Sequence, residues 1–400
     1  MFAWVMNIPP CGKILIAFMT TAILLSSSTP AAERQSAARE FFVYVGTYTG
    51  GQGRASEGVY VFRFDSTTGK ASAPVLAAKS VNPSFLALHP GGKYLYAANE
   101  VSEFAGKGVG AVGAYAIDRE TGKLTLLNQA SSGGAGPAHL TVDRTGKCVL
   151  VANYGGGSVA ALPIQADGSL GEPSSTIQHT GSSVDPNRQK EPHAHSINVA
   201  PDNRFAFAAD LGLDKMLVYR LDAGQAVLAA NDPPFASVPP GSGPRHFAFH
   251  PGGKFAYVIN EMLCTMTVFT YDARPGALKA IQTVPTLPAG ESVKPGYSTA
   301  EVVAHPTGRF LYGSNRGHDT IAVYAIGADG KLALVQNAPA EVRIPRNFNL
   351  DPTGRWLITA GQSSDNLAVF RVDPQNGKLE FTGTKLEVGA PVCVKFLPVK

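Results

Sequence analysis

Residues 243–261, GPRHFAFHPGGKFAYVINE, decide the fold of this chain, because their pattern recurs along its length. The segment indicates an apolar strand, a Pro-Gly-Gly-Lys turn and a second apolar strand that ends in Asn-Glu. Copies begin at Asn82, Gly136, His193, Ser298 and Ile344. A partial copy, APVCVKFLP, lies at the C-terminus. The fold is therefore expected to be built from one repeated unit.

The spacing of the copies predicts the size of that unit. The turn positions are 46 to 57 residues apart, with a mean of about 51, which fits one four-stranded blade of a β-propeller. Each full copy is followed by a third and a fourth apolar run. Dipeptides that end in glycine, such as Asp-Gly, mark the hairpin between these two runs. The sequence thus predicts an all-β, seven-bladed propeller with four-stranded antiparallel blades.

The two ends of the chain predict how the ring closes. The C-terminal copy supplies only a first strand, whereas FFVYVGTYT (residues 41–49) resembles the second strand of the other copies. One blade should therefore combine strands from both termini, which removes an open sheet edge. We expect a single propeller domain over residues 41–400.

Composition agrees with this architecture and excludes other classes. Only 16% of the residues are charged, and 43 glycines and 29 prolines are spread along 400 residues. The net charge is +4, from 34 Lys and Arg against 30 Asp and Glu, and no basic run is present. Neither a coiled coil nor a nucleic-acid partner is expected from these features.

The N-terminus indicates export. A weakly basic start, the apolar run ILIAFMTTAILL (residues 14–25) and a small-residue segment are typical of a signal peptide. We assign residues 1–32 to that peptide and residues 33–40 to a linker, so the mature protein is expected in the periplasm or outside the cell, with no membrane attachment. An uncleaved anchor or a misplaced start codon is the alternative. The remaining cysteines, Cys148, Cys264 and Cys393, have neither disulfide nor metal spacing and are expected to be buried.

Polar side chains gather where the first strand of each blade begins and the second strand ends. In an antiparallel blade these two points lie on one face of the disc, beside the central channel. In a chain poor in charge, the aligned positions collect histidines, arginines and glutamates. They include His139, His195, His246, Arg245, Arg316, Arg346, Glu100, Glu261 and Glu301, and His193 lies two residues before His195.

This cluster suits chemistry on an activated ester. Arginine forks can hold a carboxylate, a phosphate or a developing oxyanion, and a carboxylate or an imidazole can activate water. No G-x-S-x-G motif supports a serine nucleophile. A metal held by His193, His195 and Glu261 is the less favoured alternative, because two histidines two residues apart are a weak signal. For any single residue, the alternative explanation is that strand ends exposed to solvent are often polar without having a function.

The GPRH, NE, NRG and PRNF segments near residues 243, 260, 315 and 345, together with VGTYT and NPSFLALHP, resemble the lactonase family of seven-bladed propellers. The family includes propeller-type 6-phosphogluconolactonases and carboxymuconate-lactonizing enzymes. The resemblance covers about residues 41–398 and implies lactone hydrolysis without a cofactor or a metal. By motif, it implies a catalytic group of His195, Arg245, Glu261 and Arg316.

The resemblance implies hydrolysis of 6-phospho-D-glucono-1,5-lactone, or of a related aldonolactone if the chain is exported. We expect Arg245 and Arg316 to hold the lactone, and His195 or Glu261 to activate water. Substrate contacts are expected from His193, His246, Arg346, Glu100, Glu301 and His139. The connections at residues 171–192 and 286–297 should rim the same face. A carboxymuconate-type cycloisomerase and a non-enzymatic binding propeller remain alternatives, and the oligomeric state is left open.

Overall fold

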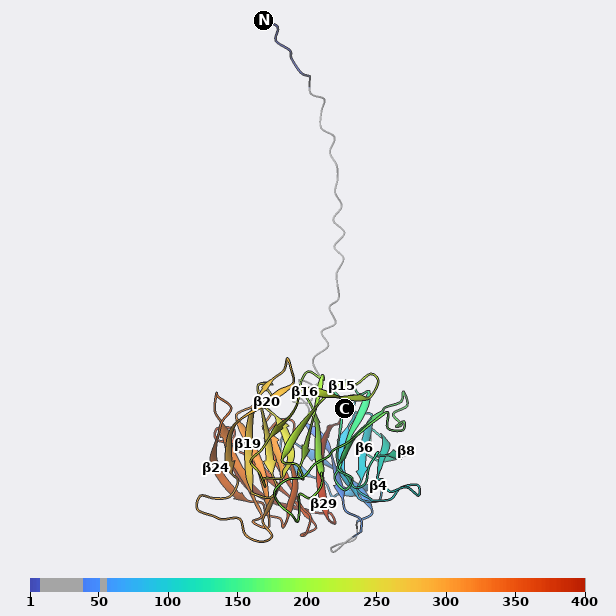
Figure 1. Ribbon diagram of the computed structural model, residues 1–400, viewed down its shortest axis with the longest axis vertical. Coiled ribbons are helices and arrows are strands. Elements are labelled where there is room, and N and C mark those ends of the chain that lie inside the picture. The colour runs from blue at the N-terminus through green and yellow to red at the C-terminus, as the bar shows by residue number, and fades with distance from the viewer. Residues whose placement is uncertain (8–38, 51–55, 400) are drawn as a thin grey trace.

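The computed structural model describes residues 1–7, 39–50 and 56–399 of the chain. Beyond residue 7, the segment assigned above to the signal peptide lies outside this range, as does the linker up to residue 38. Figure 1 shows a body made of strands, in which the first strands lie beside the last strand, β29. Within the described ranges, no helix is long and apolar enough to cross a membrane.

Seven antiparallel sheets form the blades, as the repeat predicted. Six blades use four consecutive strands each. In chain order these are β5 (Pro83–Leu88), β6 (Tyr94–Asn99), β7 (Ala111–Ile117) and β8 (Leu124–Ser131); β9 (Pro137–Val142), β10 (Cys148–Asn153), β11 (Ser158–Pro163) and β12 (Ser175–Gln178); β13 (Ala194–Val199), β14 (Phe205–Asp210), β15 (Lys215–Asp222) and β16 (Val227–Ser237); β17 (Pro244–Phe249), β18 (Phe255–Asn260), β19 (Thr265–Asp272) and β20 (Ala277–Pro285); β21 (Ser298–Ala304), β22 (Phe310–Arg316), β23 (Thr320–Ile326) and β24 (Leu332–Pro339); β25 (Pro345–Leu350), β26 (Trp356–Gly361), β27 (Asn366–Val372) and β28 (Leu379–Glu387).

The seventh blade joins the two ends of the chain. Strand β29 (Pro391–Pro398) is its innermost strand and pairs with β1 (Glu40–Thr47), which pairs with β2 (Gly58–Asp65). The outer edge is made by β3 (Lys70–Ala71) and β4 (Val75–Lys79), both paired with β2. The innermost strands contact one another in sequence around the ring, and β29 contacts β5. The closure predicted from the two partial repeats is confirmed.

Apolar side chains between neighbouring blades form the core, and at four of these contacts a buried tyrosine adds a hydrogen bond. The hydroxyl of Tyr44 on β1 donates to the carbonyl of Gly122, in the outer hairpin of the next blade, at 2.9 Å. Tyr96, Tyr257 and Tyr312 make the same bond to Gly168, Gly330 and Gly377. These phenols are buried, so the bond satisfies a polar atom that would otherwise destabilise the interface. Part of these four repeats therefore stabilises the contact between blades.

The histidines that precede the turns also bond to neighbouring blades, on the face of the disc opposite the polar strand ends. His89, His250 and His305 each contact the turn glycine carbonyl of a neighbouring blade, Gly146, Gly308 and Gly354, at 2.9 to 3.1 Å. The three cysteines at 148, 264 and 393 are buried and free, as expected.

Candidate active site

A β-bulge occurs at the start of every innermost strand and positions the side chains at the channel mouth. In β17, Pro244 and His246 pair with neighbouring residues of β18, and Arg245 is left between them. A bulge bends its strand and redirects a side chain. The other bulged residues are Ser84, Ala138, His195, Ala300 with Glu301, Arg346 and Val392. Like Arg245, the bulged residues His195, Glu301 and Arg346 are among the positions that the repeat alignment selected.

Glu261 is the centre of the site. Its Oε2 lies 3.0 Å from Nε of Arg245 and 2.9 Å from Nη2 of Arg316. Nε2 of His195 lies 3.9 Å from the same oxygen. The four residues that the family resemblance singled out therefore meet at one point. Arg245, His195 and Glu261 are only 2%, 4% and 6% exposed.

A third arginine, which the sequence did not single out, completes the ion cluster. Nη2 of Arg188 lies 2.8 Å from Oε1 of Glu261 and 3.2 Å from the hydroxyl of Tyr154. Arg188 belongs to the connection between β12 and β13, which was expected to rim this face. The sequence signal was only the length of that connection, because a single arginine in a loop has no repeat partner to mark it.

A buried polar triad holds the Arg188 connection against the blades. Nδ1 of His179 lies 2.6 Å from Oδ2 of Asp210, and Nε2 lies 2.8 Å from the hydroxyl of Tyr219. The buried side chain of Gln189 donates to the carbonyl of Leu211 at 2.8 Å. Because the side chains of His179, Asp210 and Gln189 are buried and hydrogen-bonded, the connection packs against the blades in one defined position.

The electrostatics of the cluster make Glu261 a poor base. Burial alone would raise the pKa of its carboxyl, but the charges of Arg316 and Arg245 and the hydrogen bond from Arg188 hold that pKa far below its ordinary value. Burial and neighbouring arginines lower the pKa of Arg245 to about 9, so this guanidinium is still cationic at pH 7.

His195 is the neutral group of the cluster. Burial, followed by the charge of Arg245, lowers the pKa of His195 well below its ordinary value. The imidazole is therefore neutral at pH 7, with a proton on one ring nitrogen and the other nitrogen able to accept one. Its Nδ1 is buried and has no hydrogen-bond partner in the described part of the chain.

Arg346 lies at the same mouth and is held differently from the other arginines. Its guanidinium carbon lies 5.4 Å from the centre of the Tyr48 ring, and the Tyr48 hydroxyl donates to Oε2 of Glu100 at 2.8 Å. Over residues 39–50 and 56–399, no side-chain hydrogen bond or ion pair engages the Arg346 guanidinium. Its donors are therefore free to bind a ligand anion.

The remaining predicted site residues divide between the rim and a deeper layer. His193 stacks on Tyr154 at the rim, with ring centres 4.7 Å apart. His139, His246 and Glu301 lie one position further along their strands and are buried. Nδ1 of His246 lies 2.9 Å from Oε1 of Glu301. His139, His246 and Glu301 are buried too deeply to be the first groups that a ligand meets.

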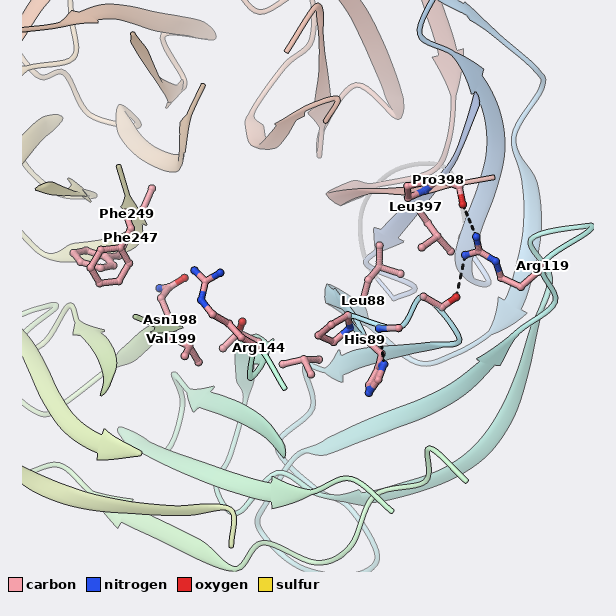
Figure 2. Close-up of a pocket in the computed structure, with 16 residues that line it drawn as sticks. Leu88, His89, Arg119, Arg144, Asn198, Val199, Phe247, Phe249, Leu397 and Pro398 are labelled. Atoms are coloured by element: carbon pink, nitrogen blue, oxygen red, sulfur yellow. Dashed lines mark hydrogen bonds between the residues drawn. The ribbon is translucent and has the colours of Figure 1, made fainter. Parts of the chain in front are cut away.

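A cavity of about 960 Å³ lies at the turn face of the disc, away from this cluster. Figure 2 shows its lining, in which Arg119 is bonded to the carbonyl of Pro398. Apolar groups such as Leu88, Phe247 and Phe249 share the wall with Arg144. This cavity lacks a carboxylate or a free imidazole, since His89 is engaged by the turn. The carboxylate and neutral imidazole that general acid–base chemistry uses lie at the arginine-rich face.

The arrangement fits an anionic or carbonyl ligand better than a metal. No group of three or more histidine, cysteine or carboxylate side chains able to hold a metal ion occurs among the residues that the structure describes. At the mouth, Arg188, Arg245, Arg316 and Arg346 face Glu100 and Glu261, which leaves an excess of two positive charges. Such a site can bind an anion and stabilise a developing oxyanion.

Comparison with known proteins agrees with the fold and with this chemistry. Residues 42–396 match the family model described as "Lactonase, 7-bladed beta-propeller". A 6-phosphogluconolactonase of Bacillus subtilis is 38% identical over 359 residues, which cover 90% of this chain and 99% of that protein. A 6-phosphogluconolactonase of Formosa agariphila is 35% identical over 84% of this chain and 94% of its own length. The solved structure of a periplasmic gluconolactonase from Pseudomonas aeruginosa is similar with a TM-score of 0.83 and 37% identity, over 90% of this chain and 100% of that one.

Proposed function

This chain belongs to the lactonase family of seven-bladed propellers, and from this premise we propose that it hydrolyses a sugar lactone, with 6-phospho-D-glucono-1,5-lactone as the expected substrate. The observation that carries the proposal is the group of three arginines around one carboxylate, with Arg346 at the same mouth and a neutral histidine beside the carboxylate. The enzyme is a carboxylic-ester hydrolase. The similar proteins that bear lactonase names support the reaction type.

Two arginines are proposed to bind the lactone carbonyl. Arg245 uses Nε for Glu261 and Nη1 for the carbonyl of Ala300, at 2.6 Å. Arg316 uses Nε and Nη2 for the carbonyl of Thr299 and for Glu261. Nη2 of Arg245 and Nη1 of Arg316 are the donors left over in the described part of the site. Fixed donors of this kind stabilise the oxyanion that forms when water attacks the carbonyl.

His195 is the proposed general base, and Glu261 is proposed to position the arginines. A carboxylate paired with three guanidinium groups has little affinity for a proton, whereas the neutral imidazole of His195 can accept one. In the reaction, the water oxygen bonds to the carbonyl carbon while its proton moves to His195. The ring C–O bond then breaks, and the proton passes to the ring oxygen, which becomes the hydroxyl of the product.

Arg346 is proposed to bind the anionic group of the substrate. It is the one arginine of the mouth whose donors are not engaged within the described residues, and its charge is part of the positive excess. A phosphoryl group bound there would leave the lactone carbonyl near Arg245 and Arg316. His193 and Glu100 are proposed as rim contacts on either side.

A second candidate is an exported gluconolactonase that acts on an unphosphorylated aldonolactone. Two observations favour it, namely the signal-like N-terminus and the similarity to a periplasmic gluconolactonase. In that case Arg346 would bind hydroxyl groups, and export to the periplasm would separate the enzyme from cytosolic phosphosugars.

The test compares the hydrolysis rates of phosphorylated and unphosphorylated glucono-1,5-lactone, each corrected for spontaneous opening. Arg245→Ala should lower kcat by about 10² to 10³-fold on either substrate. Arg346→Ala should raise KM about tenfold or more for the phosphorylated lactone alone. Arg144→Ala removes an arginine from the cavity of Figure 2 and should change neither constant. A wild-type rate no greater than the spontaneous one on both lactones would refute the proposed function.

A further inference from the structure

The cavity of about 960 Å³ on the turn face of the disc has no part in the proposed reaction. Its volume lies within the range of small-molecule sites, which is about 300–1,000 Å³. One wall is apolar and is made by side chains from separate blades, namely Leu88, Val142, Phe247, Phe249 and Leu397. The rings of Phe247 and Phe249 pack edge to face, with centres 5.0 Å apart, so this wall is a preformed aromatic surface.

Arg144 departs from the repeat at the edge of this cavity. Its position is proline in every other copy, namely Pro90, Pro201, Pro251, Pro306, Pro352 and Pro398. Proline suits that position because its fixed φ favours the turn that follows the strand, so the turn itself does not require an arginine. Arg144 lines the cavity instead. The departure therefore indicates that this arginine serves the cavity.

The guanidinium of Arg144 is oriented by the fold, and part of it is left without a partner. Its Nε donates to the carbonyl of Ala200 at 3.0 Å, and the backbone N–H of Arg144 donates to Oδ1 of Asn203 at 2.8 Å. In the described part of the chain, neither Nη group has a hydrogen bond or an ion pair. Figure 2 shows the polar ends of Arg144 and Asn198 pointing toward one another in the cavity. Together they can hold the two oxygens of a planar anion.

The cavity is positively charged as well as apolar. Arg119 is the second arginine of its wall, and its Nη groups donate to the backbone carbonyls of Gly92 and Pro398. Neither Arg119 nor Arg144 has an ion pair among the described residues, and no aspartate or glutamate of those residues lines the cavity. Asp143, next to Arg144 in the sequence, is buried and accepts hydrogen bonds from its own turn. Two cations beside an apolar wall favour a ligand with a negative charge on an apolar body.

We propose that this cavity is a second ligand site, which binds a small organic monocarboxylate with an aromatic body. The carboxylate accepts hydrogen bonds from the Nη groups of Arg144 and from the amide of Asn198, while the ring packs against Phe247 and Phe249. A sugar lactone does not suit this site, because its hydroxyl groups lose water against the apolar wall without gaining partners. The site lies on the face opposite Glu261, and the inference does not depend on lactone hydrolysis.

The first experiment titrates the protein with 3-phenylpropionate by isothermal calorimetry near pH 7. We expect binding with a Kd below about 1 mM. Two matched compounds separate the contributions, since 3-phenylpropanamide keeps the ring without the charge and propionate keeps the carboxylate without the ring. Each should bind at least about tenfold more weakly than the acid. Absence of binding at about 10 mM acid, or an amide that binds as tightly as the acid, would overturn the proposal.

Variants of Arg144 test whether the acid binds in this cavity. Arg144→Gln and Arg144→Pro should each raise Kd about tenfold or more, and Arg144→Lys should raise it less, because lysine keeps the charge without the fork. Arg144→Pro introduces the residue of the other copies, so it should fold like the wild type. Arg274→Gln removes an exposed arginine outside the cavity and should leave Kd unchanged. An Arg144→Gln variant with the wild-type Kd would refute the site.

A second measurement, ¹H–¹³C NMR of methyl-labelled leucine, locates the bound ring in the wild-type protein. The methyl signals of Leu88 and Leu397 should shift on addition of 3-phenylpropionate, whereas those of the exposed Leu263, on the opposite face, should not. Shifts at Leu263 alone would place the acid at the arginine cluster and refute the second site. Neither measurement uses a lactone, so a protein without lactonase activity would still be tested, and loss of the second site would leave lactone hydrolysis in place.

Discussion

At the scale of single residues, one carboxylate organises the channel mouth. Glu261 binds Arg188, Arg245 and Arg316 from three different parts of the chain, and each guanidinium is also bonded to a backbone carbonyl or a hydroxyl. Like charges at this distance would repel if they were left alone. The carboxylate therefore keeps the arginines together, and its own basicity is lost as a result.

Replacement of Glu261 should show this role in stability as well as in rate. Glu261→Gln leaves three guanidinium groups without their counter-charge, of which that of Arg245 is buried and that of Arg316 is mostly buried, and should lower the free energy of unfolding by about 3–5 kcal/mol. Both kcat and KM should worsen, because the lactone-binding arginines separate. Urea unfolding and steady-state kinetics measure the two effects, with the exposed Glu57→Gln as control. A loss confined to kcat, with full stability, would instead make Glu261 the base.

The pH dependence of the rate should reveal the state of His195. Because the pKa of His195 is lowered, kcat for the unphosphorylated lactone should stay constant from pH 8 to below 6.5 and fall only at lower pH. Arg346→Gln removes a cation that contributes to the shift, so the pKa should rise and the acid limb should move to higher pH. An acid limb that begins above pH 6.5 in the wild type would contradict a buried neutral base.

At the scale of elements, strands and connection contribute different parts of the site. The bulges of the innermost strands present His195, Arg245 and Arg346, and the ends of the second strands present Glu261 and Arg316. The repeat alignment found all five, because bulge and strand end recur at fixed places in each blade. It did not find Arg188, since the connection that carries it occurs in one blade only.

Docking of that connection should control the contribution of Arg188. His179→Leu removes the partner of buried Asp210 and should release the connection, so that KM rises several-fold, as in Arg188→Ala. The double variant should be no worse in KM than either single variant, because both act through the same guanidinium. Lys190→Ala, an exposed cation of the same connection, is the control. Additive effects in the double variant would show that His179 acts elsewhere.

At the scale of the whole molecule, the closed ring buries several histidines and keeps them neutral. Burial lowers the pKa of His139, His195, His246 and His305. In the unfolded chain these groups take up protons below about pH 6.5. The unfolded state then binds more protons than the folded one, so stability is present at neutral pH and is lost as the pH falls through this value.

Acid should therefore weaken the fold before most carboxylates protonate. Each such histidine adds a slope of about 1.4 kcal/mol per pH unit between its unfolded and folded pKa. Denaturant midpoints measured from pH 7.5 to 5 should fall steadily below pH 6.5, and His305→Gln should reduce the slope. A midpoint that stays constant down to pH 5 would mean that these rings are already protonated in the folded protein.

By itself, the sequence determined the repeat, the number of blades, the closure by both ends and the face on which the polar residues collect. These features follow from local patterns, namely turn residues, alternation and spacing, which recur in every copy. Only the tertiary structure decided which side chains touch. Glu261 meets three arginines and, within the described residues, Arg346 has no ion pair, because bulges, a docked connection and the contact of separate blades set these arrangements across long sequence distances.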